Sequence, residues 1–192
     1  MSFEWVNLET LAVFLGIGYL LLAMLESSLC WYFAFLSTAL YVWIFGDVSL
    51  YMESALNVYY MAMAIYGWLQ WQRGGADKSG VKIIRWTARQ HILGVAIILA
   101  ASVTSGYLLS SNTAAKLPYL DSFTTWGSIF TTIMVAQKVL ENWLYWIVIN
   151  SVSIYLYIDR GLDQTAAMFF LYLGLATIGF LMWKKAYDTQ NG

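Results

Sequence analysis

The sequence predicts an all-α integral membrane protein with seven transmembrane helices, and three observations support this fold class. Seven segments contain no Asp, Glu, Lys or Arg, and each is close to the length of about 17–25 residues that crosses a bilayer. Hydrophobic residues make up 60% of the 192-residue chain and charged residues only 11%. The apolar runs are continuous, whereas the strands of a membrane barrel alternate, and a helix satisfies its own backbone polar groups in lipid.

The predicted helices use most of the chain and leave no room for a soluble domain. In order, they cover residues 10–25, 27–46, 54–72, 92–115, 122–137, 142–158 and 164–183. The single Cys30 excludes an internal disulfide, and the single His91 is too little for a metal site. The chain contains no phosphate-binding loop, so we do not expect it to hydrolyse ATP. We predict no cofactor, no nucleic-acid partner and no enzyme activity.

The basic residues predict an orientation in the membrane. If the seven spans are right, one side of the bilayer receives Arg73, Lys78, Lys82, Arg85, Arg89, Lys138, Lys184 and Lys185, and the other receives Lys116 and Arg160. Cytoplasmic loops carry the excess of Lys and Arg, so the N-terminus is predicted outside and the C-terminus inside. The loop between the third and fourth spans contains VKIIRWTARQHI, a basic amphipathic stretch that we expect along the inner surface.

The chain also resembles itself. Leu25-Glu26-Ser27-Ser28-Leu29-Cys30-Trp31 reads like the segment 115 residues later, and Ala64-Ile65-Tyr66-Gly67-Trp68 reads like the segment 112 residues later. We therefore predict that the second copy is three residues shorter, in the turn after the paired Gly46 and Gly161. Chance similarity between apolar helices is the alternative.

An odd number of spans in each copy has a topological consequence. If two copies of three spans followed each other directly, the second copy would cross the membrane in the opposite direction to the first. The additional span between the copies gives both the same orientation. The prediction is one transmembrane domain, residues 1–192, with a 3+1+3 parallel repeat (repeat 1 about 8–73; linking helix about 90–115; repeat 2 about 121–185). Transporters with this symmetry hold substrate near the bilayer midplane, between the halves.

One part of the second copy has a specific pattern. It reads Glu141-Asn142-Trp143-Leu144-Tyr145-Trp146-Ile147-Val148-Ile149-Asn150, followed by Leu156-Tyr157, Gly161-Leu162, Thr165-Ala166 and Tyr172. This series resembles the C-terminal signature of the PnuC nicotinamide riboside transporters. The resemblance is densest over residues 137–185 and weaker over the other spans.

The resemblance implies a SWEET-like fold and facilitated uptake of nicotinamide riboside across the bacterial inner membrane. It also implies that a cytoplasmic riboside kinase traps the substrate. Transporters of thiamine or riboflavin are similar to this family, so another vitamin is an alternative substrate. The chain differs from SWEET proteins in lacking their proline hinges, because its one proline, Pro118, is expected in a loop.

The strongest candidate site is in the fifth and sixth spans. Trp143, Trp146 and Asn150 have the i, i+3, i+7 spacing of one helix face, and Gln137 and Asn142 lie nearby. Indole rings attract a flat pyridinium cation, and amide side chains match a carboxamide or a ribose diol. The alternative is that the tryptophans form an interfacial belt and Asn150 bonds a neighbouring helix.

Further candidates lie elsewhere. Trp68 and Asn57 in the third span, and Tyr172 in the seventh, are weaker candidates for substrate contact. Glu141 and Glu26, which we expect at matching positions, could serve gating or attract a cation, or each could simply stabilise a helix N-terminus. No Lys or Arg lies deep in a span, so phosphorylated substrates should be excluded.

Two other functional classes stay open. A membrane enzyme that acts on lipid would need Glu26 and Glu141 as its acid–base pair. A vitamin-binding subunit of an ATP-driven module would also suit a small multi-pass chain. The sequence leaves a homo-oligomer open.

Overall fold

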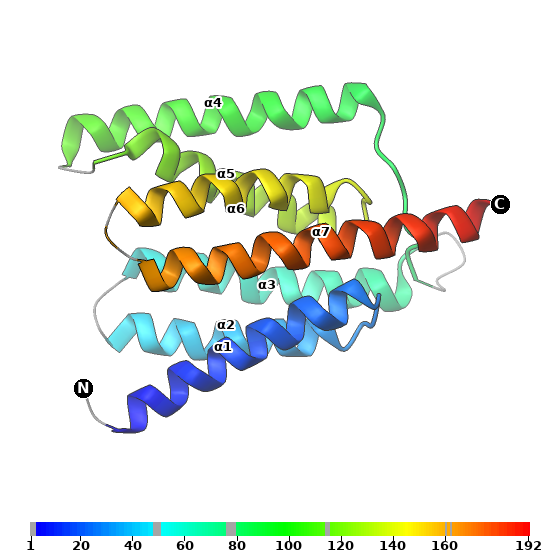
Figure 1. Ribbon diagram of the computed structural model, residues 1–192, viewed down its shortest axis with the longest axis horizontal. Helices are drawn as coiled ribbons and strands as arrows, with labels where there is room; N and C mark the ends of the chain where they lie inside the picture. Colours follow the sequence, from blue (N-terminus) through cyan, green and yellow to red (C-terminus); the bar gives the residue numbers. More distant parts are fainter. Residues whose placement is uncertain (1–2, 48–50, 76–79, 114–115, 160, 162) are drawn as a thin grey trace. The chain divides into compact units, whose positions relative to one another are not determined.

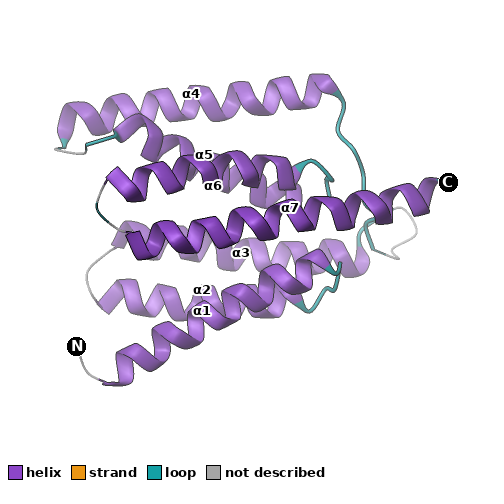
Figure 2. Cartoon of the chain, viewed as in Figure 1, coloured by secondary structure: helices purple, strands orange, loops and turns teal. Residues whose placement is uncertain are grey.

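The computed structural model describes residues 3–47, 51–75, 80–113, 116–159, 161 and 163–192. Within these ranges the regular secondary structure is helical, apart from an isolated bridge between Ile84 and Val139 (Figure 2). The helices are α1 (Phe3–Met24), α2 (Cys30–Asp47), α3 (Tyr51–Arg73), α4 (Ala88–Asn112), α5 (Pro118–Ala136), α6 (Asn142–Asp159) and α7 (Asp163–Asn191) (Figure 1). Each predicted span overlaps one of these helices, so the all-helical prediction is confirmed.

Three details differ from the predicted spans. Helix α1 begins at Phe3, before the predicted start at residue 10, and α7 continues to Asn191, past the predicted end at residue 183. The predicted spans stopped at charged residues, but a helix can continue through them. The expectation that Pro118 lies in a loop is wrong, since it is the first residue of α5. Proline fits there because the first helical position has no backbone acceptor for its missing N–H.

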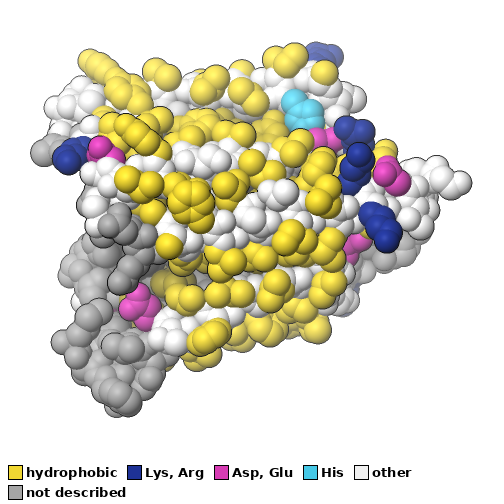
Figure 3. All heavy atoms as spheres, in the orientation of Figure 1, with side chains coloured by type: hydrophobic (Ala, Val, Ile, Leu, Met, Phe, Trp, Pro, Cys, Tyr) yellow, Lys and Arg dark blue, Asp and Glu magenta, His cyan; other side chains and the backbone are white. Residues whose placement is uncertain are grey.

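Two of the described helices have both the length and the hydropathy of a membrane span. They are Ala88–Asn112, with a mean hydropathy of 2.1, and Ala166–Asn191, with 1.9. Leu8–Met24 and Cys30–Ile44 are shorter apolar helices. Figure 3 shows hydrophobic side chains along the helices and most acidic and basic side chains near helix ends.

The chain divides into two compact units. The first unit comprises Met1–Lys82 and Ala136–Lys138, and the second comprises Ile83–Val135 and Val139–Gly192. In the first unit, α2 packs against both α1 and α3, and Ser37 Oγ donates a hydrogen bond to the Ala12 carbonyl at 2.8 Å. In the second unit, α6 packs against α7, and Trp126 Nε1 donates to Ser105 Oγ at 2.9 Å to join α5 to α4.

Several helix bounds recur along the chain at the same spacing, although the starts of α1 and α5 and the ends of α3 and α7 do not. Helices α2 and α6 begin at Cys30 and Asn142 and end at Asp47 and Asp159, and each of these pairs is 112 residues apart. The preceding turns have the same unusual backbone, with φ of 55° at Glu26 and 51° at Lys138. The predicted spacing of 115 is therefore wrong, because it would pair the first residue of α2 with a residue inside α6.

The spacing is also the same after the next turn. Helices α3 and α7 begin at Tyr51 and Asp163, again 112 residues apart. The predicted shortening after Gly46 and Gly161 is consequently wrong as well. The similarity of the two Leu-Glu dipeptides produced this error, since it shifted the first motif by three residues.

The connection into α4 is extended and anchored within the second unit. The Leu140 N–H donates to the Ile84 carbonyl at 2.8 Å. Thr87 caps α4: its Oγ1 accepts from the Gln90 N–H, and the Gln90 side chain accepts from the Thr87 N–H. The first half of the basic stretch is therefore not helical. Lys78 and Arg160, two of the residues used to predict orientation, lie outside the described residues.

Candidate functional site

Trp143 is a packing residue of the second unit. Its side chain is 2% exposed, and a Cβ added at Gly179 would lie 2.7 Å from its Cζ3 atom. The rings of Trp143 and Trp183 meet edge to face, with centroids 5.5 Å apart. Nε1 is buried with no hydrogen-bond partner among the described residues. Helix α7 therefore occupies much of the ring surface that was predicted to stack on substrate.

The first unit contains the same arrangement. A Cβ at Gly67 would overlap Trp31, which meets Trp71 edge to face with centroids 5.4 Å apart. Each of these three residues lies 112 positions before its counterpart around Trp143. Sequence reasoning did not identify Trp31. The available signal was a glycine four residues before a tryptophan, which occurs in both α3 and α7 and contacts Trp31 in one unit and Trp143 in the other.

The amide side chains of α6 are buried. Asn142 is 0% exposed; its Nδ2 donates to the Val139 carbonyl at 2.7 Å, and its Oδ1 has no partner among the described residues. Asn150 is also buried, and Trp146 is half-buried. Buried polar atoms are nearly always hydrogen-bonded, so the Asn142 oxygen is an exception among the described residues.

The other predicted substrate residues are distributed over both units. Trp68 meets Tyr32 edge to face at a centroid distance of 6.0 Å, and its buried Nε1 has no partner among the described residues. Tyr172 meets Phe169 edge to face at 5.7 Å. The first unit holds Glu26, Asn57, Trp68 and Gln137, and the second holds Glu141, Asn142, Trp143, Trp146, Asn150 and Tyr172. A substrate sandwiched by Trp68, Trp143 and Trp146 stays a prediction.

Glu141 is the centre of a polar cluster directly before α6. Its side chain is 9% exposed, and Oε1 accepts a hydrogen bond from Arg85 Nε at 2.8 Å. Oε2 accepts from the Trp86 backbone N–H at 3.3 Å and lies 3.8 Å from His91 Nε2. The hydrogen bond that Arg85 donates to Glu141 raises the pKa of Arg85, so this guanidinium stays charged. Both the ion pair and the adjacent helix N-terminus therefore stabilise the Glu141 carboxylate.

Glu26 has a different setting. It lies in the α1–α2 turn, where its Oε2 accepts from Lys138 Nζ at 3.0 Å. That ammonium also lies 4.7 Å from the centroid of the Trp71 ring. Because the helices recur at 112 residues, the counterpart of Glu26 is Lys138 and not Glu141. The expectation of matching carboxylates is therefore wrong.

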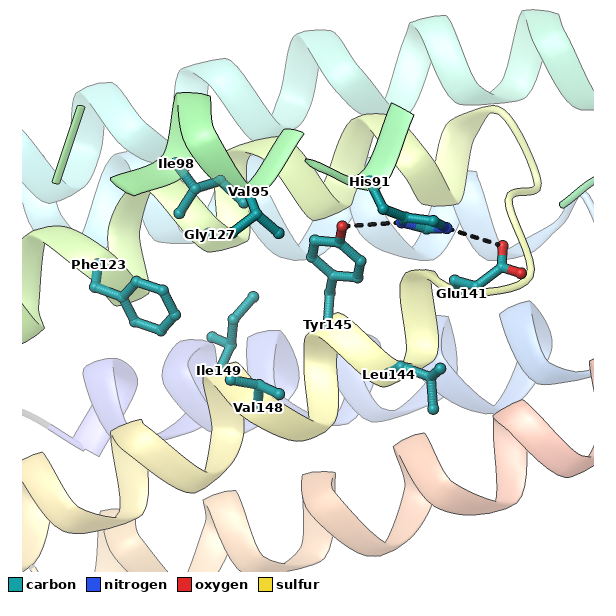
Figure 4. A pocket seen from close by; sticks show the side chains of 10 residues that line it. All are labelled: His91, Val95, Ile98, Phe123, Gly127, Glu141, Leu144, Tyr145, Val148 and Ile149. Atoms are coloured by element: carbon teal, nitrogen blue, oxygen red, sulfur yellow. Dashed lines mark hydrogen bonds and ion pairs between the residues drawn. The ribbon is translucent and has the colours of Figure 1, made fainter. Parts of the chain in front are cut away.

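A pocket of about 440 Å³ lies on the opposite face of α6 from Trp143, Trp146 and Asn150. Its lining residues come from α4, α5, α6 and the turn before α6: His91, Val95, Ile98, Phe123, Gly127, Glu141, Leu144, Tyr145, Val148 and Ile149 (Figure 4). His91 Nδ1 lies 3.0 Å from the Tyr145 hydroxyl. Of the predicted site residues, Glu141 alone lines this pocket.

Apolar helices that bury asparagine side chains among themselves are typical of multi-pass membrane proteins. The model of the nicotinamide mononucleotide transporter family matches residues 6–185, so the chain belongs to this family. This family consists of membrane transporters and not of enzymes. The prediction of a PnuC-type transporter without enzyme activity is confirmed.

Individual relatives agree with this assignment. The chain is 25% identical over 206 residues to the nicotinamide riboside transporter PnuC of Escherichia coli (strain K12), which covers 94% of this chain and 85% of that protein. It is 26% identical over 198 residues to the riboflavin/roseoflavin transporter RibM of Streptomyces davaonensis, covering 94% and 92%. A crystal structure of the vitamin B3 transporter PnuC matches with a TM-score of 0.72 and 25% identity, covering 95% of this chain and 82% of that one.

Proposed function

We propose that the chain carries nicotinamide riboside across the bacterial inner membrane by facilitated diffusion, and that phosphorylation by a cytoplasmic riboside kinase traps the substrate. The similarity to the vitamin B3 transporter structure, over 95% of this chain, is the observation that carries the proposal. The chain has no ATP-binding loop. Net flux would therefore follow the substrate gradient.

The proposed architecture is a SWEET-like 3+1+3 parallel repeat in one transmembrane domain, with the N-terminus outside. The spacing of 112 residues between the starts of α2 and α6 and between the starts of α3 and α7 supports the repeat. The charges of the second unit support the orientation. Arg85 and Arg89 lie at the start of α4 and Lys184 and Lys185 near the end of α7, whereas Lys116 lies between α4 and α5. The end that carries four basic residues would face the cytoplasm.

The proposed substrate face is the Trp143, Trp146 and Asn150 side of α6. Trp146 is half-buried and keeps ring surface for a pyridinium cation. The Oδ1 of Asn142 and the Nε1–H of Trp143 are buried and unpaired in this conformation. In a conformation that opens this face of α6, the first could accept from the amide of a carboxamide and the second could donate to its oxygen. Trp68, Asn57, Gln137 and Tyr172 would complete the site.

Transport by the purified protein in liposomes tests the proposal. Vesicles preloaded with unlabelled nicotinamide riboside should accumulate the radiolabelled compound transiently, without ATP or an ion gradient. Protein-free vesicles are the control. Absence of exchange, in vesicles that still bind the riboside, would instead indicate a binding subunit that needs an ATP-driven module.

Riboflavin is the second candidate substrate because the chain resembles RibM over 94% of its length. The two vitamins differ in charge and in ring number, so one site should distinguish them strongly. The same vesicles preloaded with riboflavin or with thiamine provide the comparison. Exchange of riboflavin but not of the riboside would assign the chain to the riboflavin branch.

A further inference from the structure

The turns before α2 and α6 contain the same hydrogen bonds, so the two units can be compared residue by residue. In the first unit the Ser27 N–H donates to the Leu22 carbonyl at 3.0 Å. The bond 112 residues later, from the Val139 N–H to the Met134 carbonyl, is 2.9 Å long. Helices α1 and α5 also end 112 residues apart. Near these turns, a residue of α5 therefore has the same place beside α6 as its counterpart in α1 has beside α2.

The two units differ in the side chains beside their buried tryptophans. In the first unit the centroids of the Tyr19 and Trp31 rings are 5.9 Å apart, and Cys30 precedes the tryptophan. In the second unit Thr131 stands in place of the tyrosine, and Asn142 stands in place of the cysteine. The second unit thus has a hydroxyl on a short side chain where the first has a phenol ring, and it has an additional amide.

Both of these polar groups are buried without a partner. Thr131 and Asn142 are each 0% exposed, and neither Thr131 Oγ1 nor Asn142 Oδ1 has a hydrogen-bond partner among the described residues. A threonine in a helix can donate to the carbonyl four residues earlier, as the adjacent Thr132 does to Ser128 at 2.8 Å. Thr131 does not make this bond, so two polar atoms in the same part of the second unit stay unpaired.

The packing of α5 on α6 places the two groups on facing sides. A Cβ added at Gly127 would lie 3.1 Å from Ile149 Cγ1, so these faces of the two helices are in contact. Thr131 follows Gly127 by four residues and Asn142 precedes Ile149 by seven, and both spacings keep residues on one helix face. Because a short turn joins the helices, the end of α5 and the start of α6 lie together. Neither Thr131 nor Asn142 lines the apolar pocket.

We propose that Thr131 and Asn142 together bind one buried water molecule between α5 and α6. Asn142 Oδ1 can only accept a hydrogen bond, so its partner must donate, whereas the Thr131 hydroxyl can donate or accept. A water molecule satisfies both groups, and buried waters typically bridge polar atoms that have no other partner. The first unit has no such amide and fills the corresponding place with the Tyr19 ring. The water site is therefore specific to the second unit.

Thr131→Val tests the proposal, because threonine and valine have nearly the same shape and only the hydroxyl is lost. If the hydroxyl binds the water, the variant loses one hydrogen bond and its Tm in detergent should fall by about 2–4 °C. If the hydroxyl is simply unpaired, valine removes a buried polar atom that had no partner, and Tm should rise. Thr132→Val is the matched control, since its hydroxyl bonds only its own helix, and it should change Tm less. An unchanged or higher Tm in Thr131→Val would overturn the proposal.

The residues of the first unit provide an independent test. Thr131→Tyr introduces the ring that Tyr19 has in the first unit; it should exclude the water and leave Asn142 Oδ1 unpaired. Asn142→Cys removes this oxygen and introduces the counterpart residue, Cys30. The double variant should therefore lose less Tm than the sum of the two single variants, because the two side chains share one water. Strictly additive losses would contradict a shared water site.

Discussion

The Trp143 indole lies against Gly179 with no space for a methyl group between them, since an added Cβ would be 2.7 Å from the ring. This contact joins α6 to α7 in the second unit. The matching contact of Trp31 with Gly67 joins α2 to α3 in the first. Both tryptophans are buried, so neither ring can move aside easily.

Alanine at Gly179 should therefore destabilise the protein. Overpacking of this kind costs about 1–3 kcal/mol, and Gly67→Ala should cost as much or more because its Cβ would overlap the Trp31 ring. Thermal unfolding in detergent measures the effect. Gly174→Ala is the matched control on α7, since nothing lies within 4 Å of its added Cβ. Equal stability of all three variants would show that the tryptophans repack freely.

Glu141 should contribute to stability through the segment before α4. Glu141→Ala removes the acceptor of the Trp86 N–H and the partner of Arg85. The loss should be about 1–3 kcal/mol, as for a buried hydrogen-bonded group whose partner is removed. Glu26→Ala is the comparison, and it should cost less because the Glu26 side chain is 30% exposed and Glu141 only 9%. Thermal unfolding and protease sensitivity near Arg85 measure both variants.

Trp146 should contribute directly to substrate affinity. Trp146→Ala should weaken nicotinamide riboside binding at least about tenfold, or 1.4 kcal/mol, through loss of stacking and cation–π attraction. Isothermal titration calorimetry of the purified variants gives the affinity. Trp43→Ala should bind normally, because Trp43 is 65% exposed on α2. An unchanged affinity in Trp146→Ala would place this ring in the interfacial belt.

Phosphorylated substrates should be excluded. The name of the matched family refers to nicotinamide mononucleotide, but the spans contain no Lys or Arg that could pair with a phosphate dianion. The basic residue next to Gln137, Lys138, is already paired with Glu26. An excess of the mononucleotide should therefore leave riboside exchange in liposomes unchanged. Competition equal to that of unlabelled riboside would contradict this prediction.

The two ends of the second unit should face different compartments. In a Cys30→Ser background, Thr113→Cys at the end of α4 should react with a membrane-impermeant maleimide added to intact cells. Thr189→Cys near the end of α7 should react only after the cells are opened. Both threonines are exposed, so access rather than burial decides the result. The reverse pattern would place the N-terminus inside.

More of the fold than of the candidate site could be predicted from the sequence. Continuous apolar segments dictated the helices, and the span 142–158 differs from α6 by a single residue at its end. The copy spacing could not be fixed because short apolar motifs match at several offsets, whereas helix starts and the positive φ of Glu26 and Lys138 depend on backbone geometry. Likewise, the one-face spacing of Trp143 and Trp146 is correct for a helix. The spacing does not tell whether this face of α6 contacts a ligand or α7. That depends on Gly179, a residue distant in sequence that lets α7 approach the Trp143 ring.

The ion pair between Glu26 and Lys138 bears on how such a chain can arise. The two residues occupy corresponding turns with the same backbone conformation. An ancestor assembled from two separate, identical three-helix chains would carry one residue type at both turns, and like charges there would repel. Attraction between the two turns therefore requires different residues at the two positions, which two identical chains could not provide.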